Sequence, residues 1–152
     1  MSMTSRPPTL LHSCAWAATA KEAAYRIDKP PAYVRTSRVF GLDPGAAAVV
    51  RDLADLPWHD TRFMAGFDPD RLADELRDAD FVLMIATADD GAAAASAIGH
   101  ACARRGITTA GIVLGLGYTA TEAVAALRPH ARVLLVTQDR QDIVEILGEV
   151  GA

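Results

Sequence analysis

Between residue 38 and the end of the chain, short apolar runs alternate five times with stretches of helical pattern. The runs that we expect to form strands are residues 38–42, 61–67, 80–87, 106–116 and 131–137. Strands joined by crossover helices lie parallel, and their connections are right-handed. The alternation therefore predicts a single doubly wound, Rossmann-like α/β domain.

The last three of these runs are almost wholly apolar. Continuous apolar runs are typical of parallel strands that are covered on both faces. We therefore expect a five-stranded parallel sheet with helices on both of its faces.

The first 36 residues stand outside this alternation. Residues 9–27 have a helical pattern, which the prolines at positions 30 and 31 end because proline cannot continue a helix. We divide the chain into residues 1–36, with a tail, a helix and a linker, and residues 37–152, the Rossmann-like domain.

The amino-acid composition argues against some classes of binding partner. A formal net charge of −4 gives no strong attraction to nucleic acid or to an anionic membrane surface. No apolar run reaches the ~18 residues of a membrane-spanning helix, and the first residues have no signal-peptide pattern. The two cysteines, Cys14 and Cys102, form no disulfide framework, and we expect each to be a small buried hydrophobic residue. A cytoplasmic protein is expected.

Ligands of doubly wound sheets bind beyond the carboxyl ends of the strands. The first loop there reads GLDPGAA and contains Gly41, Asp43 and Gly45 as candidate ligand contacts. A dinucleotide fingerprint needs glycine where Asp43 stands, because a carboxylate takes up space and repels pyrophosphate. The structural alternative is that Asp43 caps a helix and Pro44 begins it. The Asp-Pro pair at residues 68 and 69 predicts a second capped helix of the same kind.

The loop after the third expected strand lies in the sequence ATADDGAAAAS. Its candidate contacts are Ala88, Asp89, Asp90 and Gly91, of which Gly91 alone would let a ligand approach the backbone closely. The structural alternative is that one aspartate caps the following helix and the other occupies its first turn, where carboxylates are stabilised.

Residues 115–119, GLGYT, form the least acidic loop at this edge. Gly115, Gly117 and Tyr118 are therefore the best candidates to approach a ligand. Thr119 and Glu122 have the spacing of a capping box for the next helix.

The loop after the last expected strand supplies Gln138, Asp139 and Arg140. Asp139 is a candidate to bind a base or a ribose, and Arg140 to bind an anion. A helix cap is the structural alternative here too.

Four aspartates, at positions 43, 68, 89 and 90, are expected at one edge of the sheet. Carboxylate oxygens are preferred ligands of Mg²⁺, and a bound ion would bridge to a phosphate. A magnesium site is therefore one hypothesis, although capping explains each aspartate singly.

Two stretches, residues 79–114 and 122–140, resemble the nucleotide-binding domain of the FtsZ/tubulin GTPase family. VFGLDPGAAAVVRDL, residues 39–53, stands where that family has its first strand, glycine loop and helix. The resemblance spans roughly residues 38–145. It implies GTP or GDP, or another nucleotide, as ligand and the strand order 2-1-3-4-5.

The sequence differs from that family at several places, and these differences affect the activity that we expect. Its phosphate loop would fall at residues 88–95, which are nearly free of glycine, and Gln138 replaces an asparagine of the last turn. The central helix and catalytic acids of the family have no counterpart in this sequence. GTP hydrolysis is therefore not expected, and an enzyme is not favoured.

Three functions stay open at this point. The first is a non-catalytic module that binds a nucleotide or another small molecule. The second is a protein-interaction or assembly module, most simply a homo-oligomer, that has lost nucleotide binding. The third is a Mg²⁺-dependent enzyme that uses the acidic residues.

Overall fold

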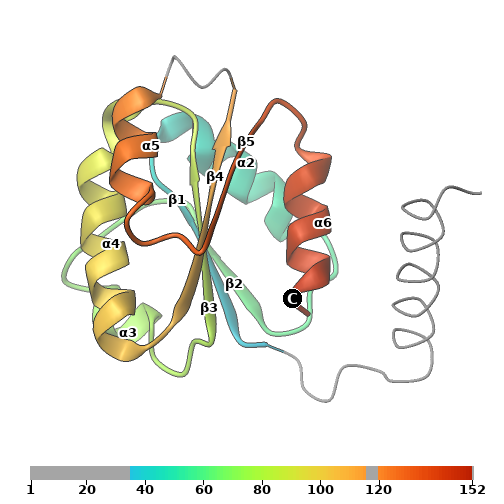
Figure 1. The fold of residues 1–152 in the computed structure, drawn as a ribbon. Helices are drawn as coiled ribbons and strands as arrows, with labels where there is room; N and C mark the ends of the chain where they lie inside the picture. Colours follow the sequence, from blue (N-terminus) through green and yellow to red (C-terminus); the bar gives the residue numbers. More distant parts are fainter. Residues whose placement is uncertain (1–34, 116–119, 152) are drawn as a thin grey trace, which may run out of the picture. The chain divides into compact units, whose positions relative to one another are not determined.

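The computed structural model describes residues 35–115 and 120–151, along which strands and helices alternate as predicted (Figure 1). The strands are β1 (Ser37–Gly41), β2 (Thr61–Met64), β3 (Phe81–Ala86), β4 (Thr108–Leu114) and β5 (Val133–Thr137). The helices are α2 (Pro44–Ala54), α3 (Leu72–Glu75), α4 (Ala92–Arg105), α5 (Thr121–Leu127) and α6 (Gln141–Glu149), with a 3₁₀ turn at Asp89–Gly91. The helix predicted over residues 9–27 lies outside the described residues.

Every strand pair is parallel, and the strands lie in the order β2-β1-β3-β4-β5. This arrangement confirms the predicted α/β fold and strand order. The chain runs from β1 outward to β2 and then returns to β3 on the other side of β1, so its direction reverses between β1 and β3. The loops that follow these two strands meet at the switch point, where such sheets bind ligands.

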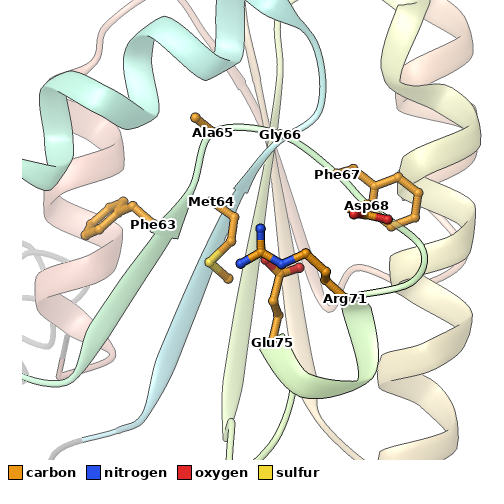
Figure 2. Close-up of a pocket in the computed structure, with 8 residues that line it drawn as sticks. All are labelled: Phe63, Met64, Ala65, Gly66, Phe67, Asp68, Arg71 and Glu75. Carbon is orange, nitrogen blue, oxygen red and sulfur yellow. The ribbon is translucent and has the colours of Figure 1, made fainter.

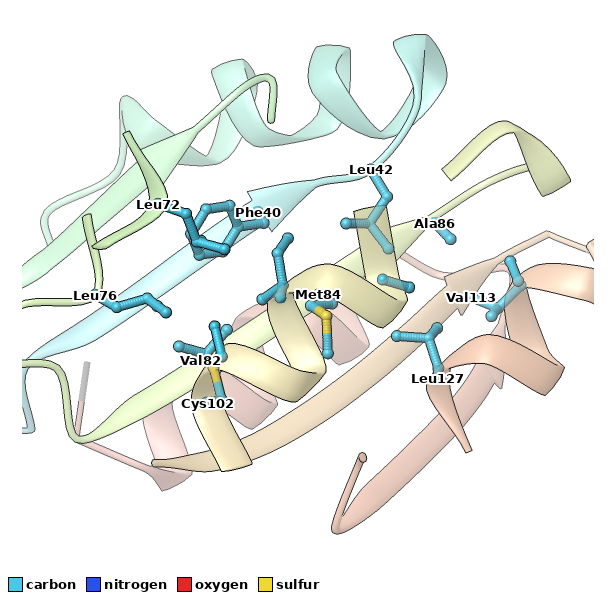
Figure 3. Close-up of a cluster of buried hydrophobic side chains, with 14 of the residues drawn as sticks. Phe40, Leu42, Leu72, Leu76, Val82, Met84, Ala86, Cys102, Val113 and Leu127 are labelled. Carbon is cyan, nitrogen blue, oxygen red and sulfur yellow. The ribbon is translucent and has the colours of Figure 1, made fainter. Parts of the chain in front are cut away.

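Helices cover both faces of the sheet, α3, α4 and α5 on one and α2 and α6 on the other (Figure 1). The central strand β3 serves both cores because its side chains alternate between the faces. Val82, Met84 and Ala86 enter the core beneath α4 (Figure 3), and Phe81, Leu83 and Ile85 enter the other. All six are buried, as the apolar run predicted. Within the described part of the chain, no helix is long and apolar enough to span a membrane.

Strand β5 corrects one prediction. It was expected to be buried on both faces, but Val133 is 55% exposed and Val136 is 43% exposed. In the described residues β5 pairs with β4 alone and forms an edge of the sheet. An apolar run does not distinguish a central strand from an edge strand, because that difference depends on which strands come to lie beside it.

The segment between β2 and β3 is less regular than predicted. The helix expected over residues 68–79 is the single turn α3, and the predicted cap on it is wrong. The Asp68 carboxylate accepts a hydrogen bond from the N–H of Asp70, 3.0 Å away, which closes an Asx turn. Asx turns and helix caps use the same residue types, so the repeated Asp-Pro pair does not show which of the two structures forms at Asp68.

The carbonyl end of α3 is held against the sheet by Arg38 of β1, which is only 4% exposed. Its Nε donates to the carbonyl of Glu75 at 2.8 Å, and its Nη2 donates to that of Arg77 at 3.2 Å. Nη1 donates to the carbonyl of Ser37 at 3.0 Å. Burial, together with the nearby charge of Arg62, lowers the pKa of Arg38. The guanidinium donates to three backbone carbonyls, and the charges of Asp60 and Asp78 partly oppose the lowering of its pKa.

We expect Arg38→Ala to lower the free energy of unfolding by about 2–4 kcal/mol, because it leaves buried carbonyls without donors. Arg62→Ala is the matched control, since Arg62 lies beside Arg38 on β2 but is exposed. Removing the repulsion of Arg62 should leave stability unchanged or slightly higher. Urea unfolding followed by circular dichroism measures both, and equal effects would contradict this role of Arg38.

Candidate functional site

Asp43 lies at the switch point and joins the loops that follow β1 and β3. Its carboxylate accepts the N–H of Ala46, in the first turn of α2, at 2.8 Å. It also accepts the N–H groups of Thr87 and Ala88, at 2.7 and 3.0 Å, and the Thr87 hydroxyl. The predicted N-cap is therefore confirmed, and the same side chain binds a second loop.

The Asp43 carboxylate stays ionised in this setting. Burial alone would raise the pKa of Asp43, but the hydrogen bonds from Thr87, Ala46 and Ala88 outweigh burial and hold it below its ordinary value. Asp43 is only 6% exposed. A fixed negative charge therefore already uses the backbone N–H groups that an incoming phosphate would need at this point.

The glycines of these loops serve packing within the chain. A Cβ on Gly91 would lie 2.4 Å from the Cβ of Leu42, and one on Gly45 would lie 2.4 Å from Oγ1 of Thr87. On Gly41, a Cβ would come within 2.9 Å of the N of Ala47. Leu42, the residue that follows β1, makes this close approach to Gly91.

Asp89 caps a different helix from the one predicted. Its Oδ1 accepts the N–H groups of Glu122 and Ala123, at 2.8 and 3.1 Å, in the first turn of α5. Among the residues that the structure describes, no side chain caps the start of α4. The capping box expected from Thr119 and Glu122 falls partly outside the described residues, and the donor at Glu122 is satisfied by Asp89 instead. Asp90 is exposed.

Residues of the last loop also form a hydrogen bond and an ion pair within the chain. The N–H of Gln141, at the start of α6, donates to Oδ1 of Asp139 at 2.9 Å. Arg140, predicted to bind an anion, pairs with Asp52 of α2 at 2.8 Å. Gln138 is exposed. Asp139 thus forms an Asx turn before α6 instead of the predicted helix cap, and an ion pair accounts for Arg140.

Of the remaining candidate contacts, Gly115, Gly117 and Tyr118, the structure describes Gly115 alone. The N–H of Gly115 donates to the carbonyl of Thr137 at 2.7 Å, and Gly117 and Tyr118 lie outside the described residues. In residues 35–115 and 120–151, no three His, Cys, Asp or Glu side chains form a group that could hold a metal ion. The four aspartates predicted to converge on Mg²⁺ therefore do not form such a site.

Cys102 is buried as expected, and burial raises the pKa of its thiol to about 11.

No protein-family model and no curated protein matches this sequence. The resemblance to the FtsZ/tubulin family therefore stays a prediction.

A hollow of about 380 Å³ lies at the carboxyl end of β2, and we call it the β2 pocket (Figure 2). It is lined by residues 63–68, Arg71 and Glu75. Oε1 of Glu75 is buried and has no hydrogen-bond partner among the described residues. Burial raises the pKa of Glu75, although the nearby Arg71 acts in the opposite direction.

A second hollow, of about 730 Å³, lies between β5 and α6, and we call it the β5–α6 groove. Its floor and walls are mostly apolar, from Phe81, Val133, Leu135, Ile146 and Val150. Asp142, Glu145 and Glu149 of α6 line it as well. The groove is therefore an apolar surface with an acidic side, continuous with the open edge of β5.

Neither hollow was identified from the sequence. The β2 pocket depends on a strand that ends at Met64 and a helix that lasts one turn, where longer elements were predicted. The β5–α6 groove depends on β5 being at an edge. One feature of the sequence could have indicated the β2 pocket. Arg71 and Glu75 carry opposite charges four residues apart, and the apolar residues Met64 and Phe67 precede them.

We expect Asp43→Ala to lower the free energy of unfolding by about 2–4 kcal/mol at pH 7, because it removes a cap and leaves N–H groups of the β3 loop unpaired. Asp68→Ala, which removes one exposed bond, is the control and should cost less than about 1 kcal/mol. Urea unfolding measures both changes.

The cost of Asp43→Ala should depend on pH. A lowered folded-state pKa stabilises the fold fully above the unfolded pKa of about 3.9, and that contribution is lost as pH falls through the folded value. The difference between the wild-type protein and Asp43→Ala should therefore shrink below about pH 4. A difference that is constant down to pH 2 would contradict an ionised Asp43.

Proposed function

We propose that this domain is a non-catalytic association module that pairs with a second copy of itself through the open edge of β5. The observation that carries the proposal is the exposure of Val133 and Val136 on that edge. Positions an odd number apart on a strand face opposite sides of the sheet. Both sides of the edge are therefore apolar, which favours an added strand over a partner that covers one face.

The ends of β5 are complementary to each other in charge. Arg132 precedes the strand and Asp139 follows it, and both are exposed. In a two-fold interface each contact occurs twice. Two antiparallel β5 strands would place Arg132 of one copy near Asp139 of the other at both ends. The same pairing would satisfy the backbone groups that an open edge leaves to solvent.

The β5–α6 groove gives such a dimer more area than one strand pair supplies. Val133 and Leu135 line this groove together with Ile146 and Val150 of α6. A paired strand would extend the sheet past the groove and cover its apolar side. Stable interfaces bury on the order of 1,200–2,000 Å², so the flanking helices have to contribute as well as the strands.

The loops at the carboxyl edge support association over nucleotide binding. The first-turn N–H groups of α2, α5 and α6 donate to Asp43, Asp89 and Asp139 of the same chain. Phosphates bind helix N-termini through these same donors. A nucleotide would have to displace the chain's own carboxylates to bind there.

We expect the full chain at about 100 μM to have a mass by light scattering of about twice the 16.1 kDa of one chain. Val133→Lys and Val136→Lys should each shift it toward the mass of one chain, because an edge lysine opposes strand pairing. Leu56→Lys is the matched control, since Leu56 is 43% exposed, as Val136 is, but lies away from β5.

Two results would overturn the assignment. One is a wild-type protein with the mass of a single chain at this concentration. The other is a Leu56→Lys variant that dissociates as readily as the β5 variants.

We further expect GTP, GDP, NAD and Mg²⁺, each at 1 mM, to shift the melting temperature by less than about 1 °C, because a ligand stabilises only through binding to the folded state. Differential scanning fluorimetry of the full chain measures the shift. A rise of several degrees with any nucleotide would favour the nucleotide-binding alternative.

A further inference from the structure

Two histidine side chains meet at the surface of the domain. His100 is an exposed residue of α4, and His130 is a half-buried residue of the turn between α5 and β5. Their ring centroids are 4.6 Å apart, and the two ring planes are inclined to each other by 72°. The two residues are distant in the sequence, so the fold alone brings their imidazoles together.

Both imidazoles project from well-fixed backbone. The ring of His130 packs on Gly99, where an added Cβ would overlap Cγ of the histidine. The N–H of His130 donates to the carbonyl of Leu127 at 3.0 Å, and its carbonyl accepts from the hydroxyl of Thr109. His100 belongs to the 14-residue helix α4. Little ordering is therefore needed to hold one ligand between the two rings.

The arrangement of the rings matches that of two imidazoles on one metal ion. A ring centroid lies about 3.2 Å from an ion that one of its nitrogens binds at about 2.0–2.1 Å. Two centroids are then about 4.5 Å apart for a right angle at the ion and about 5.2 Å apart for a tetrahedral angle. The observed 4.6 Å is close to the right-angle value. Because His100 is exposed, a half-turn about its χ2 exchanges nitrogen and carbon positions and leaves the ring plane in place.

We propose that His100 and His130 together bind one divalent transition-metal ion. Imidazole is a good ligand for copper, nickel and zinc ions, and right-angle coordination is typical of Cu²⁺ and Ni²⁺. Among the divalent ions of this series, Cu²⁺ forms the most stable complexes with a given set of ligands. The ion that the pair fits best is therefore Cu²⁺, followed by Ni²⁺.

The site is open rather than closed by protein ligands. In the described part of the chain, no third His, Cys, Asp or Glu side chain joins the pair. Water or a ligand from outside the domain fills the other positions of the ion, unlike in a structural metal site with four protein ligands. The ion is thus exchangeable. The inference does not depend on self-association, because neither histidine belongs to β5 or α6.

The test is a titration of the ¹⁵N-labelled full chain with CuCl₂, followed by the amide signals. Bound Cu²⁺ is paramagnetic and broadens the signals of nearby amides. At substoichiometric copper, the amides of residues 98–101 and 130–132 should broaden. Exposed His59, in the loop before β2, is the internal control for a single imidazole. Its surroundings should need at least about tenfold more copper, because two linked ligands bind more tightly than one.

Three variants complete the test. His100→Gln and His130→Gln should each weaken copper binding at the pair by at least about tenfold, because each leaves a single imidazole. His59→Gln is the matched control and should leave binding at the pair unchanged. Mg²⁺, which prefers oxygen ligands, should not shift the same amides of the wild-type protein. Circular dichroism establishes that each variant is folded, and exposed His100 can be replaced without disturbing the core.

Three results would overturn the proposal. The first is an absence of broadening near His100 and His130. The second is broadening near His59 at the same copper concentration as near the pair. The third is a folded His100→Gln variant that binds copper at residues 130–132 as tightly as the wild-type protein does.

Discussion

The four hydrogen bonds accepted by the Asp43 carboxylate determine how the two halves of the sheet meet. They fix the start of α2 and bind the loop after β1 to the loop after β3. The close approach of Gly45 to Thr87 and of Gly91 to Leu42 follows from this junction. In many doubly wound proteins an anionic ligand lies at this point. Here the Asp43 side chain of the protein itself supplies a negative charge at this point.

The same replacement recurs along the carboxyl edge, with Asp89 at α5 and Asp139 at α6. Two margins of the sheet carry groups that find no partner among the described residues. At β5 these are exposed valines beside unpaired strand backbone. At β2 it is the buried oxygen of Glu75. The proposed self-association uses a margin of the sheet and does not use the switch point.

The sequence predicted the architecture well, because the periodicity of apolar residues reports directly on strands and on covering helices. Local chemistry also predicted the cap at Asp43, where donor and acceptor are three residues apart. The partners of Asp43 in the β3 loop are 44 and 45 positions away, and those of Asp89 are 33 and 34. Such contacts depend on which strands become neighbours, so no local pattern revealed them. The exposure of β5 escaped prediction for the same reason.

The capping of α5 by Asp89 has a consequence for the order of folding. Helix α5 has seven residues, and isolated helices shorter than roughly 12–15 residues are marginal in water. Its first turn takes its acceptor from a loop that exists only once β3 is in the sheet. We therefore expect the unit of β1, α2 and β3 to form a nucleus, onto which α5 and β5 condense late. The edge of β5 that we assign to self-association would then be the last part of the sheet to acquire its structure.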